Sequence, residues 1–263
     1  MNNKPLFSLI TVCYNSEKTI ARTIESILKQ DFTDYEYIIV DGGSKDRTLD
    51  IVYEYEPLFD GKMKVKSERD KGIYDAFNKG IHRAIGTYVW LVNSDDFIEA
   101  QSLLLLSELI KTFPEDNLPI ISSSMNLIDT EKGIKQVQIP SEELCKKAYK
   151  NFWMGIPHPA VLIPLSIYNQ VGDYDIRFLI MADIDWFRRA YDQRQPMFFS
   201  DIVVTNMCVG GVSTTASFKK FYKDRKLLYK KHTKNVFYEK YNILKWVIIH
   251  FRDYLILLMK GFL

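Results

Sequence analysis

Short apolar runs alternate with segments of helical periodicity through the first hundred residues. Residues 6–14, 35–41 and 87–93 are largely apolar and rich in β-branched and aromatic side chains, which predicts buried strands. A shorter run over residues 63–67 predicts a further strand. Segments with apolar residues three or four positions apart separate these runs. The pattern therefore predicts a mostly parallel α/β sheet with helices on both faces.

Capping residues indicate where the helices begin and end. Ser16 precedes a helix with apolar residues from position 20 to 28, and Ser44 precedes another that reaches position 52. Serine side chains often accept a hydrogen bond from the first helical turn, so we expect both to be N-caps. A third helix, with apolar positions 77, 81 and 85, is expected to end at Gly86 in the left-handed conformation.

Length and composition indicate a globular cytoplasmic protein. At 263 residues with 47% hydrophobic side chains, the chain suits one large domain with a sizeable core, or one domain with an appendage. Its three cysteines include no C-x-x-C pair, which favours a reducing compartment over a disulfide framework or a structural zinc site. The N-terminus lacks a signal-peptide pattern. No uncharged apolar stretch reaches the roughly 18 to 20 residues of a membrane-spanning helix.

Polar residues follow three of the predicted strands. Asn15, Asp41 and the pair Asp95–Asp96 each come directly after an apolar run. In open α/β sheets, ligands bind in the crevice beyond the carboxyl ends of the strands. We therefore expect these side chains to lie at one edge of the sheet and to form a binding site there.

The adjacent acids Asp95 and Asp96 suggest a divalent cation. Two neighbouring carboxylates repel each other, and a bound cation would offset that repulsion. The chain has neither G-x-G-x-x-G nor G-x-x-x-x-G-K-[ST], so a phosphate group must be held in another way. Carboxylates suit Mg²⁺ or Mn²⁺, which can bridge diphosphate oxygens. The alternative is that one of the two acids caps a helix that begins near Ala100.

Several ordered motifs resemble a known enzyme family. They are TVCYNSEKTIARTIESILKQDFTDYEYIIVDGGSKDRT, SERDKGIYDAFNKGIHRAIGTYVWLVNSDD, PHPAVLIP, MADIDWFRRA and VGGVST. Over roughly residues 5 to 215, the chain resembles the family 2 glycosyltransferases of the GT-A fold. The resemblance implies inverting transfer of a sugar from a nucleoside diphosphate donor, with UDP favoured, to an acceptor hydroxyl. It also implies a saccharide or lipid-linked acceptor in the synthesis of cell-surface polysaccharide or glycolipid.

The resemblance assigns the nucleotide to the ends of the first strands. Thr11 and Tyr14 match positions that line the base pocket, where Tyr14 can stack on the base or instead be an aromatic at the edge of the core. Asp41 matches the acid that accepts a hydrogen bond from the base, and Asn15 belongs to the same cofactor-binding edge.

A second stretch, SERDKGIYDAFNKG, matches the region that closes over the nucleotide and sugar. Asp70 and Lys71 are the ligands expected there, and a lysine would also neutralise diphosphate charge. Arg69 and Lys79 are equally consistent with surface salt bridges.

The matching acids Asp95 and Asp96 divide ribose and metal contacts between them. The family's usual D-x-D is Asn93-Ser94-Asp95 in this chain, so its first acid is an amide. This departure weakens metal binding or moves it to Asp96.

The segment MADIDWFRRA resembles the motif that supplies the general base. Asp183 matches the catalytic acid, although Glu is more usual where Ala182 stands. Its alternative role is that of a helix N-terminal carboxylate, whose pKa the helix dipole would lower. Asp185 is expected to be structural, pairing with Arg188 or Arg189 at helical spacing.

The acceptor side holds less specific candidates. The resemblance places His158, between two prolines, in the acceptor or diphosphate region, although a lone histidine is as often simply hydrogen-bonded. Trp153 can form an apolar sugar platform or belong to the core. Gly210 and Gly211 are expected to form the hinge of a loop over the diphosphate.

The C-terminal segment differs from the rest of the chain in charge. Residues 218–263 contain twelve Lys/Arg and three Asp/Glu, a net charge of +9, so residues 1–217 carry −7 of the total of +2. We expect a catalytic domain over 1–217, with a nucleotide-sugar half near 5–100 and an acceptor half near 101–217, followed by a basic amphipathic helical tail. Such a tail suits peripheral contact with the inner face of the plasma membrane. The alternatives are packing on the catalytic domain and a homodimer contact.

The sequence also allows two functional classes other than an enzyme: a non-catalytic binding subunit and a nucleic-acid-binding protein. A non-catalytic nucleotide-sugar-binding subunit of a polysaccharide assembly complex is the main alternative, but the intact Asp96 and Asp183 argue against it. Nucleic acid is not an expected partner, because no recognised nucleic-acid-binding motif accompanies the basic tail.

Overall fold

A computed structural model describes residues 4–129, 134–209, 217–233 and 244 of the chain. Its strands are β1 (Phe7–Cys13), β2 (Tyr35–Asp41), β3 (Met63–Ser67), β4 (Tyr88–Leu91), β5 (Phe97–Ile98), β6 (Ile120–Asp129), β7 (Ile134–Gln138), β8 (Val161–Pro164) and β9 (Met197–Cys208). Its α-helices are α1 (Ile20–Leu28), α2 (Thr48–Tyr55), α3 (Ile73–Ile81), α4 (Ser102–Ile110), α5 (Glu142–Asn151), α6 (Leu165–Val171), α7 (Ala182–Asp192) and α8 (Phe218–His232). Two short 3₁₀ helices are η1 (Glu56–Phe59) and η2 (His158–Ala160).

The strands of the described residues form one sheet of mixed direction. Its order is β3-β2-β1-β4-β8-β6-β9-β5, with β7 paired to β6. The four strands of the first half are parallel, and every residue of β1, β2 and β4 is buried, as their apolar runs predict. Beyond β4 the strands pair antiparallel, except that β6 and β9 are parallel. The predicted α/β class is confirmed, whereas consecutive parallel pairing occurs only in the half in which helices alternate with strands, and the second half is mixed.

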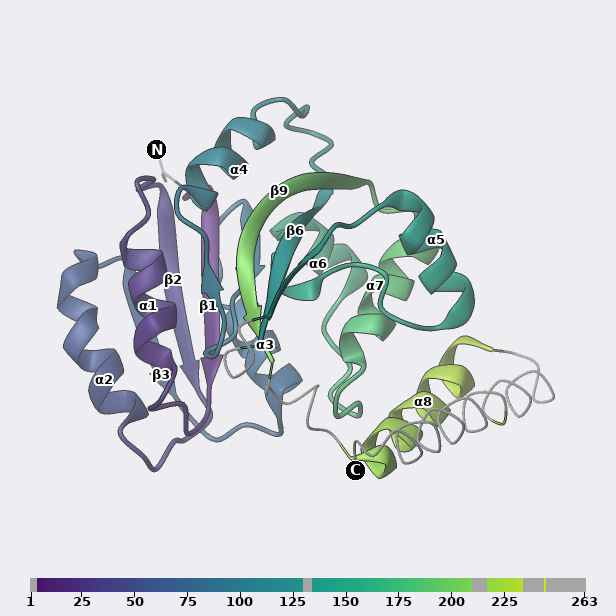
Figure 1. Ribbon diagram of the computed structural model, residues 1–263, viewed down its shortest axis with the longest axis horizontal. Helices are drawn as coiled ribbons and strands as arrows, with labels where there is room; N and C mark the ends of the chain where they lie inside the picture. Colours follow the sequence, from purple (N-terminus) through teal and green to yellow (C-terminus); the bar gives the residue numbers. More distant parts are fainter. Residues whose placement is uncertain (1–3, 130–133, 210–216, 234–243, 245–263) are drawn as a thin grey trace.

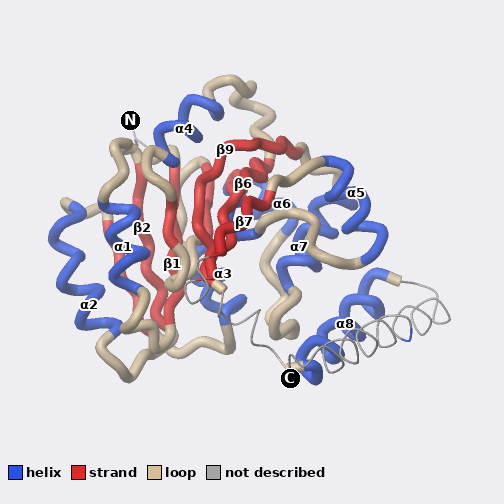
Figure 2. Tube along the Cα trace, viewed as in Figure 1, coloured by secondary structure: helices blue, strands red, loops and turns tan. Residues whose placement is uncertain are grey.

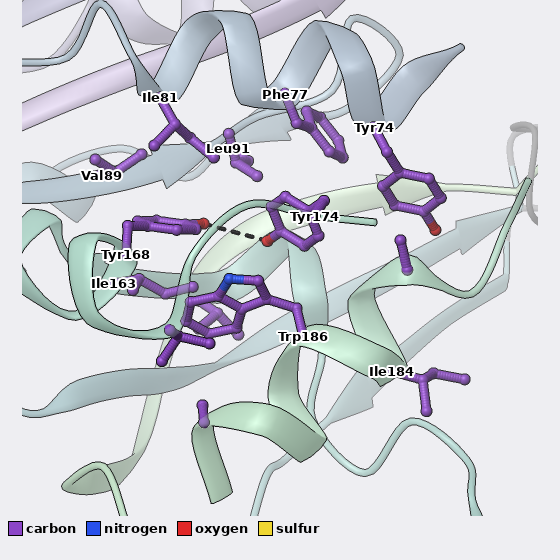
Figure 3. Packing of buried hydrophobic residues seen from close by; sticks show 14 of the residues in the cluster. Tyr74, Phe77, Ile81, Val89, Leu91, Ile163, Tyr168, Tyr174, Ile184 and Trp186 are labelled. Carbon is purple, nitrogen blue, oxygen red and sulfur yellow. Dashed lines mark hydrogen bonds between the residues drawn. The ribbon is translucent and has the colours of Figure 1, made fainter. Parts of the chain in front are cut away.

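Helices cover both faces of the sheet (Figures 1 and 2). On one face, α1, α2 and α4 pack their apolar residues against the sheet. On the other face lie α3, α6, α7 and α8. Figure 3 shows the aromatic layer of this second face, where Tyr74, Phe77 and Tyr174 lie together with ring centroids 5.8 to 6.0 Å apart.

The three predicted caps are wrong, because each residue makes a different contact instead. Helix α1 has Thr19 at its N-cap, and the hydroxyl of Ser16 lies 2.9 Å from that of Ser94. Helix α2 begins at Thr48, and the Ser44 hydroxyl donates to Asp41. Helix α3 ends at Ile81, before Gly86, which does not adopt a positive φ. A Cβ at Gly86 would lie 2.5 Å from the Ser8 hydroxyl, so glycine permits close approach to β1 there.

Helix α8 packs into the core rather than standing apart. Its Leu228 and Tyr229 are 0% and 4% exposed and belong to the cluster around α3, α6 and α7. The aliphatic segment 241–263 that suggested an interfacial helix lies outside the described residues, apart from Leu244. Within the described part of the chain, no helix is both long enough and apolar enough to span a bilayer.

Candidate active site

The ends of β1 and β2 are joined by a network of side-chain and backbone hydrogen bonds. Asn15 adopts a positive φ of 50°, its N–H donates to the Ser44 hydroxyl, and its side-chain oxygen accepts from the Lys45 N–H. The parallel register places Cys13 opposite Asp41, so the two strands end at the same level. This network fixes the loops at the edge where the sequence predicts the nucleotide.

Asp41 is buried and surrounded by donors from its own chain. Its carboxylate accepts from the N–H groups of Gly43 (3.0 Å) and Ser44 (3.1 Å) and from the hydroxyls of Ser44 (2.5 Å) and Ser67 (2.6 Å). A carboxylate offers about four lone-pair sites, so a base contact would share or replace one of these bonds. The side chain of Thr11 is also fully buried, where it accepts from the Tyr37 hydroxyl at 3.0 Å.

Tyr14 and Asp70 meet above Gly42. Tyr14 is 60% exposed, and its ring lies 3.4 Å from where a Gly42 Cβ would be. The Asp70 carboxylate lies within 2.3 Å of the same point, so glycine is required for this close approach. The other Asp70 oxygen accepts from the Gly72 N–H at 2.8 Å. An exposed aromatic ring and a carboxylate thus converge at the predicted base and ribose edge.

Of the two lysines in this stretch, one is exposed and the other forms an ion pair. Lys71 is exposed, and its backbone N–H donates to Asp75. Lys79 forms an ion pair with Asp75 at 3.3 Å and donates to the Arg69 carbonyl at 2.7 Å. The salt-bridge interpretation therefore holds for Lys79, while Lys71 has its side chain at the surface near Asp70.

The two acids after β4 differ in their surroundings. Asp96 is 2% exposed, and its two carboxylate oxygens accept from the Cys208 N–H and the Asn93 side-chain amide, both at 3.0 Å. Burial, together with the charge of Asp95, raises the pKa of Asp96 to about 7. Asp95 is half-buried, and burial raises its pKa as well. Neither acid caps the following helix, because α4 begins only at Ser102.

Oxygen atoms suited to a hard cation are present at this turn. The Asn93 side-chain oxygen is buried and has no hydrogen-bond partner among the described residues. With the Asp95 carboxylate, it offers the oxygen ligands that Mg²⁺ and Mn²⁺ prefer. No cluster of three or more His, Cys, Asp or Glu side chains able to hold a metal occurs in the described part of the chain. The residues therefore fit a cation that takes its other ligands from phosphate and water.

Asp183 lies in the first turn of α7. One of its carboxylate oxygens accepts from the Ile184 N–H at 2.8 Å, and the hydroxyl of Tyr74, on α3, lies near enough to act on the pKa of the carboxyl group. Burial raises the pKa of Asp183 to about 6. The expected lowering by the helix dipole is therefore outweighed by loss of solvent. A carboxylate with this pKa is mostly ionised at neutral pH and more basic than an exposed one, as a general base requires.

Asp185 is structural, as predicted, but it has more partners than the sequence indicated. It is fully buried and bonds to Arg189 at 3.0 Å, to Lys231 at 2.9 Å and to His232 at 2.8 Å. Burial raises its pKa, but the bonds from His232 and Lys231 outweigh this effect and lower it overall. Arg188, the other predicted partner, stacks instead on the rings of Tyr149 and Phe152.

His158 belongs to the aromatic layer beside α3. Its ring lies about 6 Å from those of Phe77, Tyr174 and Phe187, and its Nε2 is 3.3 Å from the Tyr174 hydroxyl. Burial lowers its pKa to about 4, so the imidazole is neutral at pH 7. A neutral, hydrogen-bonded ring is the simpler of the two predicted roles. Gly210 and Gly211 lie outside the described residues.

Two residues at the site were not predicted. Tyr74 stands within the quoted stretch SERDKGIYDAFNKG, but nothing in its local pattern indicates a contact with Asp183. Asp224 is fully buried, and it is the only acid in α8. Its isolation among basic residues is the one signal in the sequence that could have singled it out. A lone acid in a basic helix must be held by donors if it is buried.

The sheet order and the arrangement of helices on both faces are those of the GT-A fold of glycosyltransferases. The profile of the family described as Glycosyl transferase family 2 matches residues 8–162, and the chain belongs to this family. It is therefore an enzyme that transfers sugars, as its motifs predicted.

Relatives and solved structures agree with this assignment. The PGL/p-HBAD biosynthesis glycosyltransferase of Mycobacterium tuberculosis (strain ATCC 25177 / H37Ra) is 27% identical over 222 residues, covering 83% of each chain. S. aureus TarS 1-349, in complex with UDP-GlcNAc, has a TM-score of 0.68 and 20% identity over 94% of this chain and 72% of its own. The chain spans 42% of a longer TarS structure. The mannosyltransferase PcManGT from Pyrobaculum calidifontis, in complex with GDP-Man and Mn²⁺, has a TM-score of 0.65 and 14% identity. The match covers 88% of this chain and 65% of PcManGT.

Proposed function

We propose that this enzyme transfers a sugar, with inversion, from a nucleoside diphosphate donor to a hydroxyl of a cell-surface polysaccharide or glycolipid. UDP is the donor nucleotide we favour. The observation that carries the proposal is the half-buried Asp183 carboxylate in the first turn of α7, whose pKa of about 6 suits a general base. TarS binds UDP-GlcNAc, and the mycobacterial relative is named for PGL/p-HBAD biosynthesis, which supports the donor and acceptor classes.

Inversion requires one base and no second carboxylate beside the bond. In a direct displacement, the acceptor hydroxyl attacks the anomeric carbon as the nucleotide leaves from the opposite face. Asp183 removes the proton of that hydroxyl, and Tyr74 favours the ionised form of the carboxylate. Asp185 is the less suitable base, because Arg189, Lys231 and His232 already bond to its carboxylate.

The donor nucleotide is assigned to the ends of the parallel strands. Tyr14 stacks on the base, Asp70 and Lys71 contact the nucleotide and sugar, and Asn15 fixes the loop beneath them. Thr11 and Asp41 support this pocket from the buried side through the bonds described above. His158 lies on the acceptor side as a neutral hydrogen-bonding group.

For the divalent cation, we assign Asp95 and the unpartnered Asn93 oxygen as ligands in preference to Asp96. Both oxygens of Asp96 already accept protein hydrogen bonds, whereas the buried Asn93 oxygen has no partner among the described residues. A bound Mg²⁺ or Mn²⁺ would neutralise charge on the departing diphosphate. The fact that PcManGT was solved with Mn²⁺ supports this assignment.

We also propose that the enzyme works on the inner face of the plasma membrane, with α8 in contact with the membrane surface. Exposed lysines at positions 219, 223, 226 and 230 follow helical spacing, and the exposed Phe218 stacks with Tyr222 beside them. Basic side chains with interfacial aromatics suit an anionic bilayer. Sedimentation with phosphatidylserine vesicles tests this idea: replacing the four lysines with glutamine should abolish co-sedimentation. A change from dimer to monomer with unaltered sedimentation would instead identify a subunit contact.

Nucleotide release from a panel of donors tests the main proposal. Purified protein is incubated with UDP-glucose, UDP-galactose, UDP-N-acetylglucosamine and the corresponding GDP-sugars, with Mn²⁺, Mg²⁺ or a chelator. We expect release from at least one UDP-sugar, with loss of release on chelation. Binding without release from any donor, with or without added saccharide acceptors, would favour the non-catalytic subunit. Full activity in chelator would remove the proposed role of the cation.

A further inference from the structure

One face of α8 contacts the chain just before Asp183. Asp224 is fully buried, and its Oδ2 accepts hydrogen bonds from three consecutive backbone N–H groups. The donors are Leu179 at 2.8 Å, Ile180 at 2.7 Å and Met181 at 3.1 Å. Met181 is the N-cap residue of α7, so the segment that leads into the helix is bound to a side chain from another helix.

The same face of α8 contacts the chain just after Asp183. Lys231 and His232 bond to Asp185 at 2.9 and 2.8 Å. Positions 224 and 231 are seven residues apart on α8, two helical turns, and so lie on one face of it. Contacts from one helix therefore bracket Asp183 on both sides.

Helix α7 lacks a local cap that could do the same work. Its N-cap residue Met181 makes no side-chain capping bond, so the Met181 N–H, like those of Leu179 and Ile180 just before the helix, has no acceptor within α7. Buried donors without a partner are costly, so these groups need an acceptor. Asp224 is that acceptor, although it lies more than forty residues further along the chain.

Helix α3 completes the surroundings of Asp183 from the donor side. The hydroxyl of Tyr74 lies near enough to Asp183 to favour its ionised form. One turn along α3, Asn78 exchanges two hydrogen bonds of 2.9 Å with the backbone of Tyr174. Asp224 also lies near enough for its negative charge to act on Asp183.

We propose that Asp224 is a positioning residue for the sugar transfer: by fixing the backbone that enters α7, it holds the Asp183 carboxylate in its reactive place. This inference rests on the proposed role of Asp183 as the base. Since a displacement of about 1 Å can cost about a hundredfold in rate, losing these bonds should lower turnover. Donor binding should survive, because the donor residues lie on β1 to β4 and the loops that follow these strands.

The test compares two variants of Asp224 in the full chain. UDP release from the best substrate of the UDP-sugar panel is followed between pH 4.5 and 9, giving kcat and KM. For Asp224→Ala we expect kcat to fall roughly ten- to a hundredfold with KM unchanged. Asp224→Asn keeps an oxygen that can accept the three bonds, so most of kcat should return. In this variant the fall of kcat on the acid side of the pH profile (the acid limb) should move to lower pH, because loss of the negative charge at position 224 lowers the pKa of Asp183. Lys220→Ala, at an exposed position of the same helix, is the matched control and should behave as wild type.

The possible results separate this inference from the proposed function. Wild-type kcat and pH profile in both Asp224 variants, with Asp183→Asn inactive, would overturn the positioning role alone. Full turnover in Asp183→Asn would overturn the base assignment, and the positioning role with it. If Asp224→Ala does not fold, the pH profile of Asp224→Asn decides, and an unmoved acid limb overturns the inference.

Discussion

The chain contains two acid pairs that look alike in sequence and differ in the fold. Asp95–Asp96 follows β4, and Asp183 and Asp185 open α7. In each pair one acid is almost completely buried and bound by protein groups. Asp96 is bound by a backbone N–H and a side-chain amide, which carry no charge, and its pKa rises to about 7. Asp185 is bound by Arg189, Lys231 and His232, and its pKa is lowered.

The difference shows that burial alone does not set the behaviour of an acid. Loss of water disfavours the charged form of both carboxyl groups, and the charge of the partners then decides the outcome. Cationic partners keep Asp185 ionised and therefore structural. Neutral partners leave Asp96 easily protonated, which makes it a weaker choice as a metal ligand than Asp95.

The largest effect is expected at the base. Asp183→Asn keeps the shape of the side chain but removes its ability to take a proton, so transfer should fall by roughly two to four orders of magnitude. Donor affinity, measured by calorimetry with UDP, should be unchanged. Asp192→Asn, at the other end of α7, is the control. Normal turnover in Asp183→Asn would move the base elsewhere, with Asp185 the next residue to test.

Breaking the charged pair should mainly affect stability. Asp185→Asn removes the acid that Arg189 and His232 bond and leaves Lys231 with Asp175 as its other acid, and we expect the free energy of unfolding to fall by about 3 kcal/mol at pH 7. The folded-state pKa of Asp185 is lowered, so its contribution is present above the unfolded pKa of about 4 and is lost as pH falls further. Urea unfolding at pH 7 and pH 3.5 should show this loss. Equal stability of variant and wild type at pH 7 would contradict the structural role.

The doublet after β4 should separate into a metal ligand and a structural acid. Asp95→Asn should weaken Mn²⁺-dependent binding of UDP by about ten- to a hundredfold. Asp96→Asn should retain more of that binding, because Asp96 already accepts from Cys208 and Asn93. Titration of UDP at fixed Mn²⁺ compares the two. A greater loss in Asp96→Asn would reverse the assignment.

The pH dependence of turnover should be the mildest effect. Since Asp183 must be ionised to act as base, kcat should fall about tenfold per pH unit below about pH 6, the pKa that burial gives it. Above that pH the rate should be level until another group titrates. An acid limb centred near pH 4 would mean that Asp183 is solvated in the working enzyme.

The donor half could be predicted in more detail than the base region. Strands β1, β2 and β4 are buried on both faces, so their sequences are apolar throughout and easy to recognise. The caps failed because Ser16 bonds to Ser94 and Ser44 accepts from the N–H of Asn15, partners brought near by folding. Such choices depend on distances across the fold that no local pattern contains.

The base region depends on contacts between distant segments. The motif around Asp183 identified the residue, but its raised pKa follows from burial that a sequence does not show. Tyr74 and Asp224 reach Asp183 and its preceding backbone from α3 and α8. Residues 218–263 were predicted to form a basic amphipathic tail, and the burial of Asp224 follows from its bonds to the backbone before α7, which lies far away in the sequence.

The contact between Asp224 and the start of α7 has a consequence for how the enzyme is made. Ribosomes synthesise chains from the N-terminus at about 5–20 residues per second, and structure forms as segments emerge. The strands of the donor edge pair with neighbours close in sequence, whereas the segment before Asp183 acquires its acceptor only when residue 224 is available. We therefore expect a nascent chain to gain its donor pocket before its base is in place. Truncated chains that end before α8 would then bind nucleotide sugar without transferring the sugar.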